Sequence, residues 1–396
     1  MANSKAIDRQ YIAGTYNRFD VELAYGEGSI VYDTDGKKYI DLATGIAVNT
    51  FGYCDKGWCA AVEEQLHKLQ HTSNLYYHEP GAHLAEKLCT RTGAQSVFLS
   101  NSGAEANECA IKCARLWATR EKGSDYYHII TLKNSFHGRT ITTLAATGQD
   151  SFHTDFTPLT EGFLYAEANN AASVEELLKN YKCAAIMAEP VQGEGGVMPL
   201  DPAFLTALKA FSETYNVLLV LDEVQTGNGR SGHLYAYQHY GITPDILTTA
   251  KGLGGGLPMG ATLFFERAHG TLTTGLHGST FGGNPIAAAG ACHILDRIDD
   301  ALLAEVKAKS DYIFETLSGA PGIRSVSGLG LMIGVETEAD SSKILAACME
   351  RGILPIKAKA KIRLLPALNI PWDELKAAIA ILAEEAARAA AEATNE

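Results

Sequence analysis

The sequence predicts an α/β protein with a large, mostly parallel central sheet and a smaller α+β unit. Three observations lead to this prediction. Short apolar runs alternate with helical patterns through the middle of the chain, which is typical of strands joined by crossover helices. Several of these runs are apolar at nearly every position, as expected of strands that are buried on both faces. The two flanks of the chain differ, with shorter strand patterns and longer helical ones.

The elements follow in order along the chain. Residues 28–45 predict two short strands around an Asp35-Gly36 turn. The strands of the central sheet are predicted within residues 96–100, 128–132, 183–190, 216–224, 245–250 and 261–266. A proline near its start and apolar residues three and four apart predict a helix over 201–215. Beyond Pro285 helical patterns dominate, with strands near 322–336 and 361–368 and an alanine- and glutamate-rich helix at the end.

These patterns divide the chain into three ranges. Residues 52–285 form the large unit, and residues 286–396 form the smaller one. Residues 1–51 are expected to join the smaller unit, because their short strands resemble its pattern. A length of 396 residues is enough for two or three compact units at roughly 150 residues each.

Composition excludes several function classes. The net charge of −13 argues against a nucleic-acid or anionic-membrane surface, and no apolar run reaches the roughly 18 residues of a membrane span. None of the eight cysteines forms a C-x-x-C pair, so no metal site is predicted. The cysteines are expected to be buried thiols of a cytoplasmic protein.

Chemically versatile residues follow five of the predicted strands. The strands lead into "NSGAEANE", "KNSFHGRT", "VQGEGG", "DEVQTGNGR" and Lys251. Ligands of open parallel sheets bind beyond the carboxyl ends of the strands. The sequence therefore predicts one shared site at this edge.

Three of these positions have a functional and a structural interpretation each. Ser102 and Glu105 predict a capping box, which leaves Gly103 at a helix N-terminus that either binds an anion or simply begins a helix. Asp222 ends a buried strand, so its carboxylate needs a partner, either a structural arginine or a protonated cofactor ring. Lys251 is either a nucleophile of lowered pKa or a surface lysine in a mobile loop.

Together the three residues indicate pyridoxal phosphate. This cofactor requires a lysine for its aldehyde, an acid for its ring nitrogen and a helix end for its phosphate. The glycines after Lys251 leave room for the ring. Two other classes were weighed. A dinucleotide loop at "GLGGGLP" lacks the third glycine of its motif and the acidic residue about twenty positions on. A binding protein without activity would not need both Lys251 and Asp222.

Longer motifs carry a resemblance to a family. They run from residues 15–49 through "SNLYY", "NSGAEANE", "SFHGRT", "EPVQGEGGV", "LDEVQTGNGRSG", "AKGLGGGLPMGA" and "GSTFGGNP" to "KIRLLPAL". In these motifs the chain resembles the class III, subgroup II aminotransferases of fold type I, over nearly its whole length. The resemblance implies a pyridoxal-phosphate enzyme that is an obligate homodimer with shared active sites.

The resemblance also implies a role for each matching residue. Lys251 would bond to the cofactor and move the proton, and Asp222 would hold the ring nitrogen. The other cofactor contacts that it implies are Ser102, Gly103, Ala104, Phe136, Val224, Gln225 and, from the neighbouring subunit, Thr280. The substrate contacts that it implies are Tyr16, Ile46, Arg139, Glu194, Ser279 and Arg363, with Glu194 next to Arg363.

The chain departs from the family pattern at two places, and the resemblance also bears on the choice of substrate. Many relatives have threonine in place of Ala104, and histidines in place of Tyr53 and Asp55. Ile46 and "SNLYY" resemble the branch that acts on N-acetylornithine with 2-oxoglutarate, giving glutamate, in arginine biosynthesis. Ornithine, succinylornithine, succinyldiaminopimelate and 4-aminobutyrate enzymes share most motifs, and glutamate-semialdehyde aminomutase is a further relative of a different class.

Overall fold

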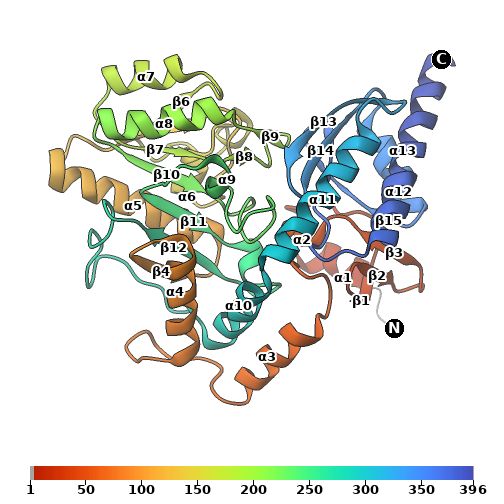
Figure 1. Ribbon diagram of the computed structural model, residues 1–396, viewed down its shortest axis with the longest axis horizontal. Helices are drawn as coiled ribbons and strands as arrows, with labels where there is room; N and C mark the ends of the chain where they lie inside the picture. Colours follow the sequence, from red (N-terminus) through yellow and green to blue (C-terminus); the bar gives the residue numbers. More distant parts are fainter. Residues whose placement is uncertain (1–3, 396) are drawn as a thin grey trace.

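The computed structural model describes residues 4–395. A large central sheet with its helices forms one side of the molecule, and the N-terminal strands and C-terminal elements form the other (Figure 1). The predicted fold class is confirmed by this arrangement. The boundaries at residues 51 and 285 stay predictions, and the ends of the predicted ranges, residues 1–3 and 396, lie outside the described residues. Within residues 4–395, no helix combines the length and apolar character that a membrane crossing requires.

The central sheet has seven strands in the order β4-β12-β11-β10-β7-β5-β6. Their bounds in that order are Ser96–Ser100, Gly260–Phe264, Ile246–Thr249, Leu218–Asp222, Cys183–Ala188, His128–Leu132 and Phe163–Ala166. Strand β12 is antiparallel to both of its neighbours, β4 and β11. The remaining pairs, from β11 through β10, β7 and β5 to β6, are all parallel. The carboxyl ends of β4, β5, β7, β10 and β11 therefore meet at one edge, as predicted. The sequence prediction missed the edge strand β6.

Both faces of this sheet are covered, which explains its apolar strands. Along β10, Leu218 and Val220 pack with helix α5 (Gly103–Lys122) on one face. Leu219 and Leu221 pack into the larger core on the other face. The helices around that core are α4 (Glu79–Thr92), α7 (Ala171–Asn180), α8 (Pro202–Thr214) and α10 (Pro285–Arg297). Short helices α3 (Lys56–Leu66), α6 (Ile141–Ala146) and α9 (Tyr237–Tyr240) complete this side.

The other side has two four-stranded sheets. One has the order β1-β2-β3-β15, with bounds Leu23–Glu27, Ile30–Asp33, Lys38–Asp41 and Ile353–Leu354. The other has the order β13-β14-β17-β16, with bounds Ile323–Leu329, Met332–Thr337, Lys361–Leu364 and Ile356–Ala358. Helices α11 (Asp300–Leu317), α12 (Ser341–Glu350) and α13 (Trp372–Asn395) share an apolar core with these sheets. Because β3 pairs with β15, the N-terminal strands share a sheet with a strand of the C-terminal part; that residues 1–51 join the smaller domain stays a prediction.

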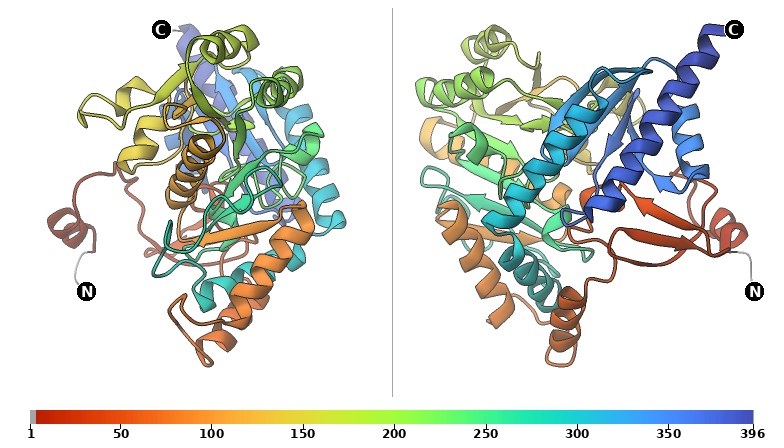
Figure 2. Two further views of the ribbon diagram at one scale, coloured as in Figure 1. Left: turned by 90° about the vertical axis from the view of Figure 1, so that its left-hand side faces the viewer. Right: turned by 45° about the vertical axis from the view of Figure 1, so that its right-hand side comes forward.

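The N-terminal helix is peripheral, whereas a short hairpin with a buried first strand carries a predicted site residue. Helix α1 (Ser4–Tyr11) has no buried residue and stands out from the body of the molecule (Figure 2). Strands β8 (Val191–Gln192) and β9 (Met198–Pro199) form a two-stranded hairpin. The loop between these two strands carries Glu194.

The turn α2 (Thr44–Ala47) is left-handed. All four residues have positive φ angles, 48° for Thr44, 64° for Gly45, 66° for Ile46 and 62° for Ala47. Backbone bonds close the turn, from the Ala47 amide to the Ala43 carbonyl and from the Val48 amide to the Thr44 carbonyl. A left-handed residue other than glycine costs roughly 1–2 kcal/mol. Three such residues among four consecutive positions therefore need support from the surrounding structure.

Candidate active site

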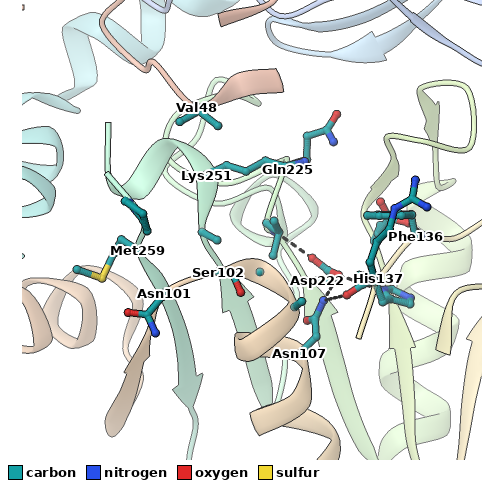
Figure 3. A pocket seen from close by; sticks show the side chains of 18 of the residues that line it. Val48, Asn101, Ser102, Asn107, Phe136, His137, Asp222, Gln225, Lys251 and Met259 are labelled. Carbon is teal, nitrogen blue, oxygen red and sulfur yellow. Dashed lines mark hydrogen bonds and ion pairs between the residues drawn. The ribbon is translucent and has the colours of Figure 1, made fainter. Parts of the chain in front are cut away.

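A cavity of about 450 Å³ lies at the carboxyl edge of the parallel strands. Figure 3 shows side chains from several strand ends and from the start of α5 around it. Nine of the predicted site residues line it: Ser102, Gly103, Ala104, Phe136, Arg139, Asp222, Val224, Gln225 and Lys251. The shared site predicted from the strand ends is therefore present as a cavity.

Lys251 is the second residue after β11 and begins the single turn η2 (Lys251–Leu253). Its φ of 45° turns the chain sharply at the strand end, and its side chain reaches into the cavity (Figure 3). Burial lowers the pKa of Lys251 to about 8, and the charge of nearby Glu194 only partly opposes this effect. Roughly a tenth of the amine is then neutral at pH 7, far more than for a lysine of ordinary pKa, and the neutral amine is the nucleophile.

Asp222 ends β10 on the floor of the cavity and is 4% exposed. Its Oδ2 accepts hydrogen bonds from Asn107 Nδ2 at 2.7 Å and from His137 Nδ1 at 2.8 Å, and its Oδ1 accepts one from the Val224 amide at 3.0 Å. Burial disfavours charge on His137, but the hydrogen bond to Asp222 raises the pKa of that imidazole. Within residues 4–395 the ion-pair partner of Asp222 is this histidine rather than an arginine.

The helix that begins at Gly103 is capped differently from the prediction. Ser102 Oγ accepts from the Glu105 amide at 3.2 Å, as expected. The Glu105 carboxylate instead accepts from the Asn101 amide, at 2.6 Å, so the reciprocal half of the predicted capping box is wrong. The reason is that Asn101, not Ser102, presents its amide toward the first turn. Ser102, Gly103 and Ala104 still lie at a helix N-terminus that faces the cavity.

Arg363 and Glu194 form an ion pair beside the cavity, in agreement with the proximity that the sequence suggested. Arg363 Nη1 lies 2.6 Å from Glu194 Oε1 and donates a further bond to Gln225 Oε1 at 3.1 Å. The guanidinium is only 2% exposed. Burial favours the neutral form of Glu194, but the charge of Arg363 lowers the pKa of this carboxyl below its ordinary value.

Arg139 is the second cationic side chain at the cavity. Its guanidinium lies 5.8 Å from the centre of the Phe136 ring and 4.6 Å from that of Phe152. Rings at this distance attract the cation and orient it. Arg139 forms no ion pair with a described carboxylate, so its charge is available to a ligand.

The remaining predicted residues lie outside the cavity lining. Ile46 is 41% exposed and is two residues from Val48, which lines the cavity. Ser279 accepts from Asn101 Nδ2 at 3.2 Å, and Thr280 next to it is exposed. Tyr16 is 72% exposed and lies in a separate groove of the N-terminal segment. The roles assigned to these residues stay predictions.

The sequence analysis missed two members of the buried network. Asn107 donates to Asp222 and also accepts from Thr248 Oγ1 at 2.7 Å. His137 lies within "SFHGRT", but no role was assigned to it. Asn107 is four residues after Gly103 and so one helical turn further along α5. That spacing was the signal that could have placed it on the cavity side of the helix.

The two departures near residue 54 have local partners. Tyr53 lies beside the buried Asp41, and burial together with the charge of that carboxylate raises the pKa of the Tyr53 hydroxyl. Asp55 caps α3 by accepting from the Trp58 amide at 3.0 Å and forms an ion pair with Arg297 at 2.6 Å. Neither residue lines the cavity with Lys251. Both substitutions therefore serve the packing of the chain around this cavity.

The residues present fit pyridoxal phosphate. Gly103 is required for the width of the cavity, because a Cβ added there would come within 2.7 Å of Val224 Cγ1. Phe136 and Val224 both line the cavity and can cover two faces of a flat ring. An amine, a carboxylate and a helix N-terminus are the groups that bind this cofactor's aldehyde, ring nitrogen and phosphate. Such a fold and such a site define an enzyme of the pyridoxal-phosphate transferase class.

The chain belongs to the class-III aminotransferases, because a sequence model described as Aminotransferase class-III matches residues 11–385. It is 47% identical over 382 residues to the acetylornithine aminotransferase of Haemophilus ducreyi, covering 96% of this chain and 97% of that one. It is 41% identical to the acetylornithine aminotransferase of Methanocaldococcus jannaschii, with 96% of each chain covered.

Solved structures agree with this assignment. The ornithine aminotransferase of Toxoplasma gondii ME49 has a TM-score of 0.94 at 32% identity, covering 98% of this chain and 95% of that chain. The N-acetylornithine aminotransferase of Stenotrophomonas maltophilia has a TM-score of 0.84 at 35% identity, covering 97% of this chain and 98% of that chain. The protein is therefore an aminotransferase, and its family implies pyridoxal phosphate as cofactor.

Proposed function

We propose that the protein transfers the terminal amino group of N2-acetyl-L-ornithine to 2-oxoglutarate, giving N-acetyl-L-glutamate 5-semialdehyde and L-glutamate in arginine biosynthesis. The observation that carries this proposal is the Arg363–Glu194 ion pair beside Lys251. It offers one pocket a way to accept two amino donors of different shape. The names of the relatives support the same donor.

Lys251 is the group that acts on the donor. Pyridoxal phosphate, when bound, supplies an aldehyde that bonds to amines and a ring that withdraws electrons from the donor carbon. Lys251 Nζ would be the group that holds the cofactor. The same Nζ would remove and return the proton at the donor carbon, a role that its lowered pKa supports.

Asp222 would hold the ring nitrogen of the cofactor with its negative charge. Its hydrogen bonds from Asn107 and His137 and from the Val224 amide stabilise the ionised carboxylate. A nearby carboxylate favours a proton on the ring nitrogen, and this proton strengthens electron withdrawal. Ser102 and Gly103 offer the helix N-terminus to the phosphate, with one hydroxyl fewer than relatives that carry threonine in place of Ala104.

Arg139 and Arg363 bind carboxylates at different distances from the ring. N-acetylornithine reacts at its terminal amine, so its carboxylate lies far from the ring, where Arg139 can bind it. Its methylenes then lie near Arg363, whose unpaired charge would be costly to bury; the ion pair with Glu194 removes that cost. Glutamate reacts at its α-amine and brings a carboxylate close to the ring. That carboxylate would displace Glu194 and bind Arg363 in a bidentate manner.

Ornithine is the second candidate donor, because the ornithine aminotransferase of Toxoplasma gondii has a closely similar fold. Ile46 favours the acetylated donor, because an aliphatic side chain there leaves more space than an aromatic one for the acyl group. Comparing kcat/KM for N-acetylornithine, ornithine, succinylornithine, succinyldiaminopimelate and 4-aminobutyrate with 2-oxoglutarate decides between the donors. A clear preference for ornithine would overturn the proposal.

The homodimer and the cytoplasmic location belong to the same proposal. Several large apolar side chains are exposed, among them Leu75 at 87%, Tyr77 at 106% and Phe281 at 60%. Exposed apolar side chains that gather on one face mark an interface, and Phe281 adjoins Thr280, whose expected role is at the neighbouring subunit's phosphate. Light scattering coupled to gel filtration tests the dimer, and a monomer at micromolar concentration would contradict it.

A further inference from the structure

The left-handed turn Thr44–Ala47 touches the segment that carries the catalytic lysine. Thr50 Oγ1 donates to the Gly252 carbonyl at 2.7 Å. A Cβ added to Gly252 would lie 3.3 Å from the Ala47 carbonyl oxygen, so the turn closes against the backbone next to Lys251. Val48, the residue after the turn, lines the cavity itself. A shift of this turn would therefore move both a wall of the cavity and the segment that holds the lysine.

The same turn also packs against the two segments that carry Glu194 and Arg363. Ala47 is buried in a small apolar cluster with Val191 and Val197, which lie on either side of Glu194. Leu365, two residues after Arg363, belongs to the same cluster. The Thr44 hydroxyl donates to the Leu365 carbonyl at 2.6 Å. The turn is thus a common support for the lysine, Glu194 and Arg363.

One carboxylate holds this turn in its unusual conformation. Asp41 Oδ1 accepts from the Ala43 amide at 2.7 Å and from the Thr44 amide at 3.1 Å, and Oδ2 accepts from the Thr44 amide at 3.0 Å. The Asp41 side chain is 2% exposed. A buried carboxylate that accepts several backbone bonds cannot leave without exposing unpaired donors. It therefore favours the left-handed start of the turn over extended alternatives.

Asp41 is fixed from the other side by groups outside the turn. Tyr53 lies beside it; burial raises the pKa of the Asp41 carboxyl, and the charge of the buried Arg230 partly opposes this rise. Arg230 itself donates to the carbonyls of Leu331 and Pro366. These contacts anchor Asp41 between the two sides of the molecule. They also give a physical role to Tyr53, which stands where many relatives have histidine.

We propose that Asp41 is a positioning residue for donor selection: by holding Thr44–Ala47 left-handed, it fixes the cavity wall and the Lys251 and Glu194 segments relative to one another. It touches neither donor nor cofactor. The acylated donor is longer than glutamate and contacts more of the cavity wall. Its binding therefore depends more strongly on the position of the turn. The dependence on acyl length rests on the proposed function; the support of the turn does not.

The test compares Asp41→Asn with a matched control, Asp33→Asn. Asp33 also accepts from two backbone amides, those of Asp35 and Lys37, and from a tyrosine hydroxyl, that of Tyr39. It lies in β2, away from the cavity. Each holoenzyme is assayed by stopped-flow half-reactions with N-acetylornithine and with glutamate. Cofactor absorbance and Tm are recorded for both variants.

The expected result is a change in selectivity. Asp41→Asn should lower kcat/KM for N-acetylornithine about tenfold more than for glutamate, mainly through KM, while Asp33→Asn leaves the ratio within about twofold. Adding Ala47→Gly to Asp41→Asn should restore part of the ratio, because glycine takes a positive φ without strain. Equal losses for both donors, or a restored Tm with an unrestored ratio, would overturn the proposal.

Two further measurements keep the outcome decisive. If Asp41→Asn does not fold, Tyr53→Phe replaces it, since this variant removes the hydroxyl beside Asp41 and keeps the carboxylate. A smaller shift of the ratio in the same direction supports the proposal, and an unchanged ratio overturns it. The parent enzyme is first assayed with all donors. If N-acetylornithine is not a donor, the proposed function fails, and the longest accepted donor replaces it in the comparison with glutamate.

Discussion

Arg363 Nη1 lies 2.6 Å from Glu194 Oε1 and 3.1 Å from Gln225 Oε1. The guanidinium is therefore neutralised and oriented before any substrate arrives. Its Nε atom is buried and makes no hydrogen bond, which leaves an unused donor for an incoming carboxylate. This arrangement explains how a cation can lie near the methylenes of one substrate and still bind the carboxylate of another.

Glu194→Gln should separate the two half-reactions. The change frees Arg363, so the glutamate half-reaction is expected to hold or gain. The acetylornithine half-reaction should lose roughly 1–3 kcal/mol of transition-state stabilisation, the strength of a charge-assisted contact. Stopped-flow kinetics with each donor measures this, with Glu167→Gln, an exposed ion-pair partner of Lys133, as the control. Equal losses for both donors would mean that Glu194 is not a switch.

Arg139→Ala should weaken both half-reactions, because both donors are expected to place a distal carboxylate there. We expect KM to rise for each donor, with a loss in kcat/KM of roughly 1.5–3 kcal/mol, typical of a hydrogen bond to a charged group. Cofactor binding should be retained. A variant that loses activity with only one donor would show that Arg139 does not serve a shared carboxylate.

The reactivity of Lys251 should follow a pKa of about 8 instead of the ordinary value of 10.5. Because the neutral amine reacts, attachment of pyridoxal phosphate to the apoenzyme should rise with pH. The rate should increase about tenfold between pH 7 and 9 and then level off. Borohydride reduction followed by mass spectrometry measures the attachment, and Lys251→Ala should show none. A rate that keeps rising to pH 10 would contradict the lowered pKa.

Gly103→Ala should damage cofactor binding without unfolding the protein. The new methyl group would lie 2.7 Å from Val224 Cγ1 and 2.9 Å from its Cγ2, so Val224 must move into the space for the ring. Overpacking of this kind costs roughly 1–3 kcal/mol. Equilibrium titration with pyridoxal phosphate gives the change in Kd. Gly14→Ala, which meets no atom within 4 Å, is the control, and equal affinities would refute the prediction.

The strands and the three central residues could be predicted because their signals are local. Apolar runs marked the buried strands, and Ser102, Asp222 and Lys251 each stand at the end of one. The reversed direction of β12 was not predictable, since its run is as apolar as those of its parallel neighbours. The loop before it is short enough for a hairpin-like return from β11, but sequence alone does not separate that path from a crossover.

The supporting network could not be predicted because its contacts cross long stretches of chain. His137 reaches Asp222, 85 residues away, and Asn107 reaches the same carboxylate over 115 residues. The spacing of Asn107 places it on one side of a helix but does not say which carboxylate it contacts, and His137 in a polar segment carries no local sign of burial. The same holds for the Thr44 hydroxyl, whose acceptor at Leu365 lies 321 residues further on.

The pairing of β3 with β15 also sets the order in which the chain can complete its fold during synthesis. Ile40 pairs with Ile353, and the Leu42 carbonyl accepts from the Leu365 amide. At roughly 5–20 residues per second, a ribosome needs about 15–60 s to make the intervening segment. Throughout that time β3 has an open edge, and the turn that supports Lys251 lacks its Leu365 anchor. The catalytic lysine is thus translated well before the support that positions it, and the turn gains this support only once residues through Leu365 have emerged.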